Sequence, residues 1–401
     1  MKSLITPEDA RRLIQENLNK MPQVLCPLDK CAGRILRQQV LSDRPFPPFN
    51  RSMMDGYAIR ASDIDGNALF NIVAECSAGD PQITLDSRPL SCAEIMTGAI
   101  LPENADCVVP YETTTRPHTT QMQLKSPTEH AAGDCIHKLG SDRAADAILL
   151  DEGATIGARE TAIAASCGYA DLLVSRKPAL AVVSTGDELI NICDEPEPHQ
   201  IRRSNHLMID TALERIGLNV REFVHLKDDC AQSINELKLL LENNDVIIIS
   251  GGISMGKKDF IPEALQELGF TCHFHGVAQK PGKPFGFWTN EDSAVFALPG
   301  NPLSSLSCLH HYVIPSLFDA SGKTANCPAV ELTLRTDAKT RDDMTVLLPV
   351  KKSPGNLISP QLVNNSGDLV GILESDGYIV LPPRDEKSYP AGSQFEFFPW
   401  Y

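Results

Sequence analysis

Three short loops, each directly after an apolar run, carry the residue types that bind oxyanions. Glycine lets backbone N–H groups approach a phosphate closely, and a helix that starts after the loop adds a favourable dipole. The loop residues are Ser184, Thr185, Gly186, Ser250, Gly251, Gly252, Ser254, Gly256, Pro299, Gly300, Asn301 and Pro302. Each loop alone is equally typical of an ordinary strand-to-helix turn. Together they indicate a site for a phosphate or another oxyanion.

Carboxylates lie close to these loops in the sequence. Glu188 follows the first loop, Asp259 follows the second, and Asp228 follows another apolar strand pattern. Hard cations such as Mg²⁺ take carboxylate and phosphate oxygens together, so these acids predict a metal-phosphate site. Solvated surface acids are the alternative, because the chain has 52 Asp and Glu residues.

Two lysines lie in a proline-stiffened turn, KPGKP, at residues 280–284. The prolines restrict the backbone around Lys280 and Lys283, and the chain around them is acidic. An anion is the natural ligand of such a turn, and a solvated basic turn is the alternative.

Two other motifs are weaker. Residues 251–258, GGISMGKK, follow the Walker pattern as far as its lysine, but Lys258 stands where that pattern needs Ser or Thr for magnesium. The 12 cysteines include no CxxC pair, so we expect reduced and mostly buried thiols. The nearest approach to a zinc cluster lies at residues 272–275 and 308–311, where packing histidines are the more common case.

The composition limits the classes of partner. There are 36 Lys and Arg against 52 Asp and Glu, a formal charge of −16 that repels nucleic acid and anionic lipid, and no basic tract offsets it. The first residues match neither a signal peptide nor a transit peptide, and the apolar runs are far shorter than the roughly 20 residues that span a bilayer. We expect a soluble, cytoplasmic protein without nucleic-acid or membrane partners.

Alternating strand and helix patterns from about residue 178 to 322 must position the three loops. Repeated strand-helix units require a parallel sheet with helices on its faces, which predicts a doubly wound α/β domain. Ligands bind such a sheet beyond the carboxyl ends of its strands, and this is where the loops fall.

The remaining segments predict three further parts. A helix from about Pro7 to Lys20, capped by Thr6, opens the chain, and a helical pattern returns within residues 151–170. Short apolar pieces broken by Pro, Gly and Asp indicate a β-rich insert, and the tail predicts a small β-barrel or sandwich. The predicted domains are residues 1–43 with 140–176, then 44–139, 177–322 and 323–401.

Two turn-rich clusters complete a set of motifs that resembles a known family. They are PPFNRSMMDGYA at 47–58 and IMTGAILP at 95–102, and they precede STGDEL, RSN, SGGISMG, KPGKP and LPGNP. In this order, over almost the whole chain, the set resembles the molybdopterin molybdenumtransferases, the MoeA proteins and the related gephyrin E domain. The resemblance implies a central α/β domain like MogA and MoaB, a β-rich insert, a small mixed N-terminal domain and a C-terminal β-barrel.

The resemblance also implies an enzyme of molybdenum cofactor biosynthesis. Such an enzyme inserts molybdate into adenylylated molybdopterin, releases AMP and depends on Mg²⁺. The implied catalytic residues are Asp55, Thr97 and Asp142 around the reacting centre and Glu188, Asp228 and Asp259 at magnesium or the nucleotide phosphate. The implied substrate-binding residues are Asn205, Lys280, Lys283 and the loop residues named above.

The resemblance further implies a homodimer with composite sites, in which the region of Asp55, Thr97 and Asp142 faces residues 188–302 of the other chain. A molybdopterin adenylyltransferase and molybdoenzymes that accept the product are the other implied partners.

Some residues depart from the family pattern. Residues 135–142, CIHKLGSD, stand where relatives often have several arginines, Asn50-Arg51 stands where many have Asp-Asn, and Gly276 stands where they often have a basic residue. If His137 replaces a permanent cation, molybdate stimulation should weaken as pH rises through the histidine range. A catalytically weakened molybdopterin-binding or scaffold paralogue is therefore the alternative function, and an NTPase using GGISMGKK is a third.

Overall fold

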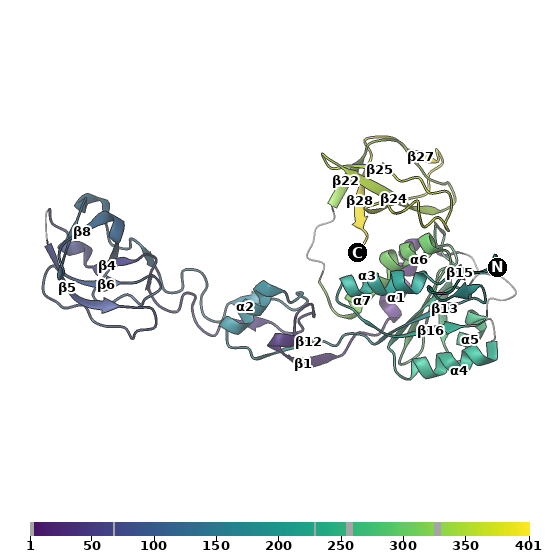
Figure 1. Cartoon of the computed structure of the whole chain (residues 1–401), viewed down its shortest axis with the longest axis horizontal. Helices are drawn as coiled ribbons and strands as arrows, with labels where there is room; N and C mark the ends of the chain where they lie inside the picture. Colours follow the sequence, from purple (N-terminus) through teal and green to yellow (C-terminus); the bar gives the residue numbers. More distant parts are fainter. Residues whose placement is uncertain (1–3, 67–68, 228–229, 254–259, 325–329) are drawn as a thin grey trace. The chain divides into compact units, whose positions relative to one another are not determined.

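The chain folds into two compact units (Figure 1). Unit 1 comprises Met1–Gln38, Glu152–Ala158 and Asp171–Tyr401, and unit 2 comprises Gln39–Asp151 and Arg159–Ala170. The computed structural model describes residues 4–66, 69–227, 230–253, 260–324 and 330–401. The division into four domains is finer than these two units and stays a prediction.

Unit 1 contains the predicted α/β domain, whose sheet has the order β16-β13-β17-β21-β20-β18. The strands are β16 (Val220–Leu226), β13 (Leu180–Thr185), β17 (Val246–Ser250), β21 (Ala294–Leu298), β20 (Gly286–Thr289) and β18 (Thr271–His275). The first four are parallel, and β20 and β18 are antiparallel to their neighbours. Strands β13, β17 and β21 are buried along their whole length, which explains their unbroken apolar runs. The predicted doubly wound domain is confirmed.

Helices cover both faces of this sheet. One face packs against α1 (Pro7–Asn17), α3 (Asn205–Arg215), α6 (Pro302–Cys308), the π-helix η5 (Leu309–Val313) and α7 (Ile314–Ala320). The other packs against α4 (Cys230–Leu241) and α5 (Ile261–Glu267). Thr6 caps α1 by accepting a hydrogen bond from the Asp9 N–H at 3.0 Å, although α1 ends earlier than the sequence predicted. Within the described ranges, no helix has the length and hydropathy needed to cross a membrane.

The C-terminal part of unit 1 is a closed β-barrel. The sequence predicted either a barrel or a sandwich here, and the structure shows the barrel. Pairing runs β24-β25-β22-β28-β26 and returns from β26 to β24, so the ring has no free edge. Its strands are β22 (Val330–Leu334), β24 (Thr345–Ser353), β25 (Leu357–Pro360), β26 (Gly377–Leu381) and β28 (Gln394–Pro399). Strand β19 (Gln279–Lys280) pairs with β24 and so connects the KPGKP turn to the barrel.

Short elements complete unit 1. They are β1 (Gln23–Pro27) with β12 (Asp171–Ser175), β14 (Leu189–Ile190) with β15 (Ile201–Arg202), β23 (Ala338–Lys339) with β27 (Ser388–Tyr389), and the 3-10 turn η1 (Leu28–Lys30).

Unit 2 is the predicted β-rich insert, built on a sheet of order β7-β4-β6-β5-β9-β8. These strands are β7 (Cys107–Pro110), β4 (Gly56–Ile59), β6 (Ser91–Ile95), β5 (Leu69–Cys76), β9 (Gln121–Leu124) and β8 (Thr114–His118). The other elements are β2 (Val40–Leu41) with β11 (Ile148–Leu150), β3 (Arg51–Ser52) with β10 (Ile136–His137), α2 (Ala158–Ser166), η2 (Ala61–Asp63), η3 (Tyr111–Thr113) and η4 (Pro127–Glu129). Buried side chains on both faces of the sheet form its core.

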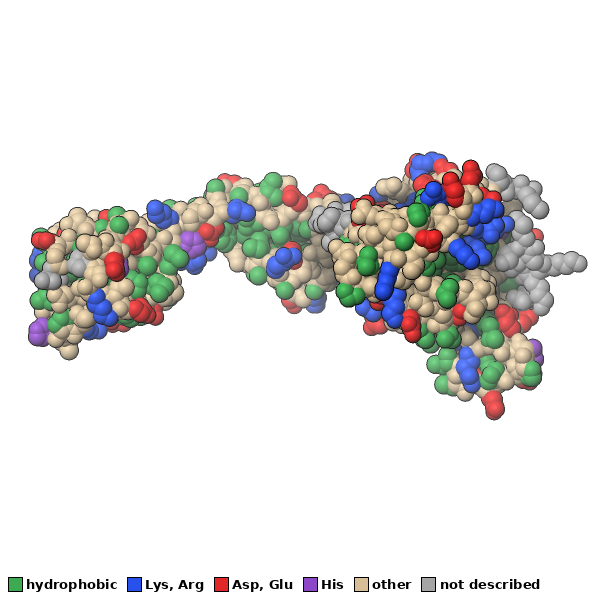
Figure 2. All heavy atoms as spheres, turned by 90° about the horizontal axis from the view of Figure 1, so that it is seen from above, with side chains coloured by type: hydrophobic (Ala, Val, Ile, Leu, Met, Phe, Trp, Pro, Cys, Tyr) green, Lys and Arg blue, Asp and Glu red, His purple; other side chains and the backbone are tan. Residues whose placement is uncertain are grey.

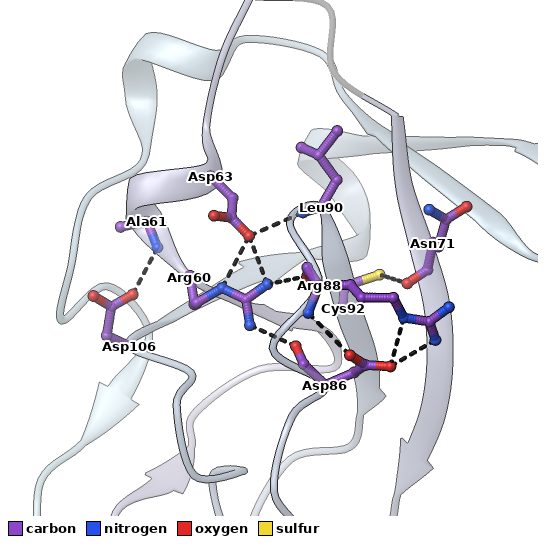
Figure 3. Close-up of polar contacts among 9 residues, drawn as sticks. All are labelled: Arg60, Ala61, Asp63, Asn71, Asp86, Arg88, Leu90, Cys92 and Asp106. Atoms are coloured by element: carbon purple, nitrogen blue, oxygen red, sulfur yellow. Dashed lines mark hydrogen bonds and ion pairs between the residues drawn. The ribbon is translucent and has the colours of Figure 1, made fainter.

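A polar network fixes the turn that follows β4 (Figure 3). Arg60 pairs with Asp63 at 2.8 Å and donates hydrogen bonds to the carbonyls of Asp86 and Arg88. Asp63 also accepts from the Leu90 N–H at 3.0 Å. These contacts tie η2 to residues 86–90, so the charges of Arg60 and Asp63 serve the fold of the insert.

Two buried histidines of η5 lie against the barrel. His310 accepts from the Tyr401 N–H at 3.0 Å through Nε2, and its Nδ1 lies 3.0 Å from the Leu306 carbonyl. His311 Nδ1 is 3.2 Å from the Tyr378 hydroxyl. Burial lowers the pKa of His310 to about 4 and that of His311 to about 3, so both imidazoles are neutral in the folded protein at neutral pH.

We expect the free energy of unfolding to fall as pH decreases from about 6.5 towards about 4, because histidines of the unfolded chain bind protons that buried His310 and His311 do not. One pKa unit corresponds to about 1.36 kcal/mol, so the effect is on the order of a few kcal/mol. Urea unfolding at several pH values should show a smaller slope in His310→Gln than in wild type. His199→Gln, which removes an exposed histidine, is the control. Equal slopes in wild type and His310→Gln would contradict this account.

Candidate functional site

A cavity of about 760 Å³ lies beyond the carboxyl ends of β13, β17 and β21. The predicted substrate-binding residues that line it are Ser184, Thr185, Gly186, Asn205, Ser250, Gly251, Gly252, Lys280, Lys283, Pro299, Gly300, Asn301 and Pro302. Glu188 lines it as well. Ser254, Gly256, Asp228 and Asp259 lie outside the described residues. The structure thus brings together motifs that are more than 100 residues apart in the sequence.

The second glycine loop packs directly on Thr185. Gly251 and Gly252 have φ angles of +101° and +65°, and a Cβ at either position would lie 2.7 or 2.9 Å from Thr185 Oγ1. Only glycine allows both this backbone conformation and this approach. Thr185 is 4% exposed, and its hydroxyl has no hydrogen-bond partner in the described part of the chain. A buried hydroxyl without a partner is available to a ligand oxygen.

Asn205, at the start of α3, links the loops to one another. Its Nδ2 donates to Ser250 Oγ at 2.9 Å and to the Gly300 carbonyl at 2.7 Å. Its Oδ1 is buried and has no partner among the described residues. Since the amide group is fixed through Nδ2, Oδ1 presents a positioned acceptor that suits an N–H donor of a heterocycle.

The charge around the cavity is mainly positive. Arg202, Arg203, Lys280 and Lys283 are the cationic residues of the described lining, and Glu188 is its carboxylate. Arg203 donates to the side chain of Asn191 through Nη2, while its buried Nε has no described partner. An anionic ligand fits this charge distribution.

The KPGKP turn rests on a buried polar network. Gln279 is fully buried and accepts a hydrogen bond from the Tyr312 hydroxyl. It donates to the Gly282 carbonyl at 3.4 Å and to Cys308 Sγ at 3.5 Å. The Tyr312 ring stacks on Phe285, with ring centroids 4.7 Å apart. The network holds the segment between Lys280 and Lys283 against α6 and η5.

The barrel also contributes to the cavity, which the sequence did not reveal. Ser366, Gly367 and Met344 belong to the lining, and Ser366 Oγ accepts a hydrogen bond from Asn301 Nδ2 at 2.8 Å. The run NNSGD at 364–368 is typical of a turn, and it was the sequence signal that could have pointed to Ser366. In the structure, Asn365 Oδ1 accepts a hydrogen bond from the Gly367 N–H at 2.8 Å. Arg202 was missed too, because it precedes the RSN motif.

Among the three predicted magnesium ligands, Glu188 is the one that lies within the described residues. A Cβ at Gly186 would lie 2.6 Å from Glu188 Oε2, so the carboxylate is close to the backbone of the first loop. No group of three or more His, Cys, Asp or Glu side chains able to hold a metal exists among the described residues. Glu188 thus offers one described carboxylate to a hard cation, and the other two predicted ligands, Asp228 and Asp259, lie outside the described residues.

Unit 2 brings the predicted Asp55 and Thr97 into contact. Asp55 Oδ1 accepts from the Thr97 N–H at 2.6 Å and from its hydroxyl at 2.8 Å. These bonds lower the pKa of Asp55, because they stabilise its charged form. Asp55 is therefore an ionised acceptor with a fixed orientation.

The third predicted residue of unit 2, Asp142, pairs with His137. His137 Nε2 lies 2.8 Å from Asp142 Oδ1, which also accepts from the Ser141 hydroxyl at 3.2 Å. The His137 contact is the main cause of the lowered pKa of Asp142. The Ser52 N–H donates to the Ala99 carbonyl, and the Met53 N–H donates to the Cys135 carbonyl. The segment of residues 52–53, which leads to Asp55, is therefore bonded both to the residues that follow Thr97 and to the residues that precede His137.

A doubly wound α/β domain with a cationic cavity at its loop edge, joined to a closed barrel, defines a class of protein that binds an anionic ligand. Comparisons with known proteins specify the class. Residues 5–168 match the family described as the MoeA N-terminal region (domain I and II), and residues 181–319 match a probable molybdopterin binding domain. The chain therefore carries both halves of one family architecture.

Individual relatives extend over the full length. The molybdopterin molybdenumtransferase of Synechocystis sp. is 35% identical over 99% of this chain and 100% of its own, and that of Staphylococcus epidermidis is 31% identical over 94% and 91%. The crystal structure of a molybdopterin biosynthesis MoeA protein from Pyrococcus horikosii is 28% identical and covers 100% of both chains with a TM-score of 0.82. The chain belongs to the molybdopterin molybdenumtransferase (MoeA) family.

We expect Gly282→Ala to destabilise unit 1 by about 1–3 kcal/mol more than Gly269→Ala. Both glycines have positive φ, +94° and +81°, so both variants strain the backbone. A Cβ at residue 282 would lie 2.5 Å from Cys308 Sγ and 2.6 Å from Gln279 Nε2, whereas at residue 269 nothing lies within 4 Å. Urea unfolding of the two variants measures the difference, and equal losses would show that the buried network does not constrain the turn.

Proposed function

We propose that the protein inserts molybdate into adenylylated molybdopterin and releases AMP, as an enzyme of molybdenum cofactor biosynthesis. The observation that carries this proposal is the convergence of the family motifs of unit 1 on one cationic cavity in a chain that matches a molybdopterin molybdenumtransferase over 99% of its length. The cavity offers what an adenylylated pterin needs: N–H donors for its phosphates, a fixed amide for its heterocycle and lysines for its anionic groups.

The residues of the cavity divide these tasks. Thr185 and the backbone of residues 250–252 bind phosphate oxygens, and Asn205 Oδ1 accepts from the pterin. Lys280 and Lys283 hold oxyanions, while Pro299 and Pro302 shape the loop beside them. Glu188, with Asp228 and Asp259, would hold Mg²⁺, which when bound neutralises charge on the phosphate bridge to AMP.

Asp55, Thr97 and Asp142 belong to the reacting region in this proposal. Thr97 directs both of its bonds to Asp55 Oδ1, and no described residue bonds Oδ2. The ionised Asp55 therefore retains an acceptor for a proton or a hydrogen bond from the substrate. Asp142 is fixed in the same way by His137.

We further propose a homodimer in which this region of one chain faces the cavity of the other. Apolar side chains are exposed beside the reacting residues: Phe49, Met53, Met54 and Leu139, of which Met53 is 56% and Leu139 53% exposed. A contiguous apolar patch rimmed by polar residues is typical of a protein interface, and we expect these four side chains to form such a patch. In a symmetric dimer, each chain would contribute both halves of two identical sites.

The chemistry of the substrate and product defines the other partners. An adenylylated pterin is the product of a molybdopterin adenylyltransferase, and the finished cofactor must pass to a molybdoenzyme. Figure 2 shows acidic as well as basic side chains among the residues drawn in colour, and the formal charge of −16 disfavours nucleic acid as a partner.

We expect purified protein with adenylylated molybdopterin, Mg²⁺ and molybdate to release AMP well above a protein-free control. Glu188→Gln should lower the rate at least about tenfold, because it removes the charge of a ligand at the phosphate. Chromatographic measurement of AMP tests both points. No AMP above the control would overturn the proposed function, and magnesium-dependent nucleotide hydrolysis without any pterin would indicate an NTPase.

We expect inactive Asp55→Ala chains and inactive Glu188→Ala chains to restore activity when they exchange subunits. In each mixed dimer, one composite site carries both lesions and the other carries neither. Random exchange makes about half the dimers mixed, each with one intact site of two, so activity should recover to roughly a quarter of wild type. Activity that stays at background despite demonstrated exchange would mean that each chain builds its own site.

A further inference from the structure

Tyr312 is a buried residue outside the cavity that bonds to a residue at its edge. It lies in η5, is fully buried and does not belong to the described lining of the cavity. Its hydroxyl donates to Gln279 Oε1, and Gln279 directly precedes the KPGKP turn. Any effect of this hydroxyl on a ligand must therefore pass through Gln279.

The amide of Gln279 fits its surroundings in one orientation. Its Nε2 donates to the Gly282 carbonyl at 3.4 Å and to Cys308 Sγ at 3.5 Å. A rotated amide would point its oxygen at the Gly282 carbonyl, and two acceptors cannot bond one another. Oε1 must then face Tyr312, whose hydroxyl supplies the proton of that bond. Burial raises the pKa of Tyr312 well above its ordinary value, so the hydroxyl stays a donor at neutral pH.

The bonds of Gln279 converge on the backbone between the two lysines of the turn. The Gly282 carbonyl, which accepts from Gln279, also accepts from the Phe285 N–H at 3.1 Å. The Val277 N–H donates to the Lys283 carbonyl at 2.8 Å. Buried groups thus fix the course of the backbone that carries the lysines.

Burial differs between the lysines and the residues that hold them. Gln279, Pro281 and Gly282 are buried, whereas Lys280 and Lys283 are exposed and line the cavity. Neither ammonium group has a described hydrogen-bond or ion-pair partner. A lysine is a point charge on a flexible stem, so the place of its charge depends on how well its backbone is fixed.

The network that fixes the turn carries no charge of its own. Gln279 is neutral, and burial raises the pKa of both Tyr312 and Cys308, which keeps them protonated. Its contribution to the binding of an anion is therefore geometric and not electrostatic. Removal of the Tyr312 hydroxyl changes no charge, so a substitution there tests position alone.

The ring of Tyr312 is held independently of its hydroxyl. It stacks on Phe285, and the His311 ring meets it edge-on, each with centroids 4.7 Å apart. His311 Nδ1 lies 3.2 Å from the hydroxyl of Tyr378 in β26 of the barrel. A phenylalanine at residue 312 would keep these ring contacts and lose only the hydrogen bond. Tyr378 offers the same buried chemistry farther from the turn.

We propose that Tyr312 is a positioning residue of the cavity: its hydroxyl fixes Gln279, and Gln279 fixes the turn that presents Lys280 and Lys283 to an oxyanion. Without this bond the turn would sample more positions, and a ligand would have to order it on binding. The inference rests on the proposed function, which assigns oxyanions to these lysines. Molybdate and the phosphate of the adenylylated substrate share that chemistry, and the tests separate the two.

AMP release measured against molybdate and against adenylylated molybdopterin provides the first test. Tyr312→Phe should raise the half-saturating concentration of the substrate that the lysines hold about threefold to tenfold, the size of one net hydrogen bond. The kcat should change less than about twofold, because the lysines bind the ground state and the transition state alike. Tyr378→Phe, which removes a hydroxyl from His311, is the matched control. An equal shift in Tyr378→Phe would reveal a general loss of stability and overturn the inference.

A double variant separates position from stability. Tyr312→Phe leaves Gln279 Oε1 buried without a donor, so it should lower the melting temperature. Adding Gln279→Met should recover part of that loss, since two apolar partners of similar shape can be nearly neutral. The half-saturating concentration should stay raised, because the bond to Gly282 is then missing as well. Recovery of both quantities together would make Tyr312 merely structural.

Chemical labelling of the lysines provides a readout apart from activity. Mass spectrometry after treatment with acetic anhydride measures how strongly sodium molybdate or AMP protects Lys280 and Lys283. In wild type, at least one of these anions should protect both lysines together, and Tyr312→Phe should need about threefold to tenfold more of it. Wild-type lysines that neither anion protects, or protection unchanged in Tyr312→Phe, would overturn the inference.

The outcomes separate the inference from the proposed function. A wild-type protein that releases no AMP but whose lysine protection depends on Tyr312 would retain the inference and reject the enzyme. AMP release with unchanged half-saturating concentrations in Tyr312→Phe would retain the enzyme and reject the inference. If Tyr312→Phe does not fold, the double variant with Gln279→Met decides in its place, because it buries no unpartnered amide.

Discussion

The close approach of residues 251 and 252 to Thr185 is the contact on which the cavity depends. Neighbouring parallel strands place their carboxyl ends at one edge of the sheet, but ordinary loops there would be separated by their side chains. Two glycines with positive φ remove that separation and bring backbone N–H groups beside a buried hydroxyl. Asn205 then fixes the neighbouring loops by bonding Ser250 and Gly300. The geometry of the site thus follows from a packing constraint in the sheet.

The fold could be predicted wherever local patterns correspond to burial. Strands β13, β17 and β21 are buried throughout, and their apolar runs predicted a parallel sheet correctly. The barrel was less certain, because alternating short strands are compatible with a barrel or a sandwich until the pairing of β24 with β26 closes the ring. The end of α1 was placed too late, since nothing in residues 18–20 marks a helix end as strongly as Thr6 marks its start.

The candidate site was predictable to the extent that its residues lie in motifs. The glycine loops and the KPGKP turn carry their chemistry in consecutive residues, and the structure gathers them around one cavity. Gln279 and Met344 could not be found in this way, because no local motif marks them, whereas the turn-type run at 364–368 was a signal for Ser366. Gln279, for example, acquires its function from Tyr312, 33 residues later, and from the turn of a π-helix that no simple period predicts.

The same limit explains the basic segment of unit 2. Read along the chain, residues 135–142 offer His137 and Lys138 as their basic side chains. Read across the strands, β3 places Arg51 opposite His137 of β10, so a guanidinium from 86 residues earlier in the chain lies beside the imidazole. His137 Nε2 in turn lies 2.8 Å from Asp142 Oδ1, so this row of polar side chains follows from strand pairing and not from a consecutive motif.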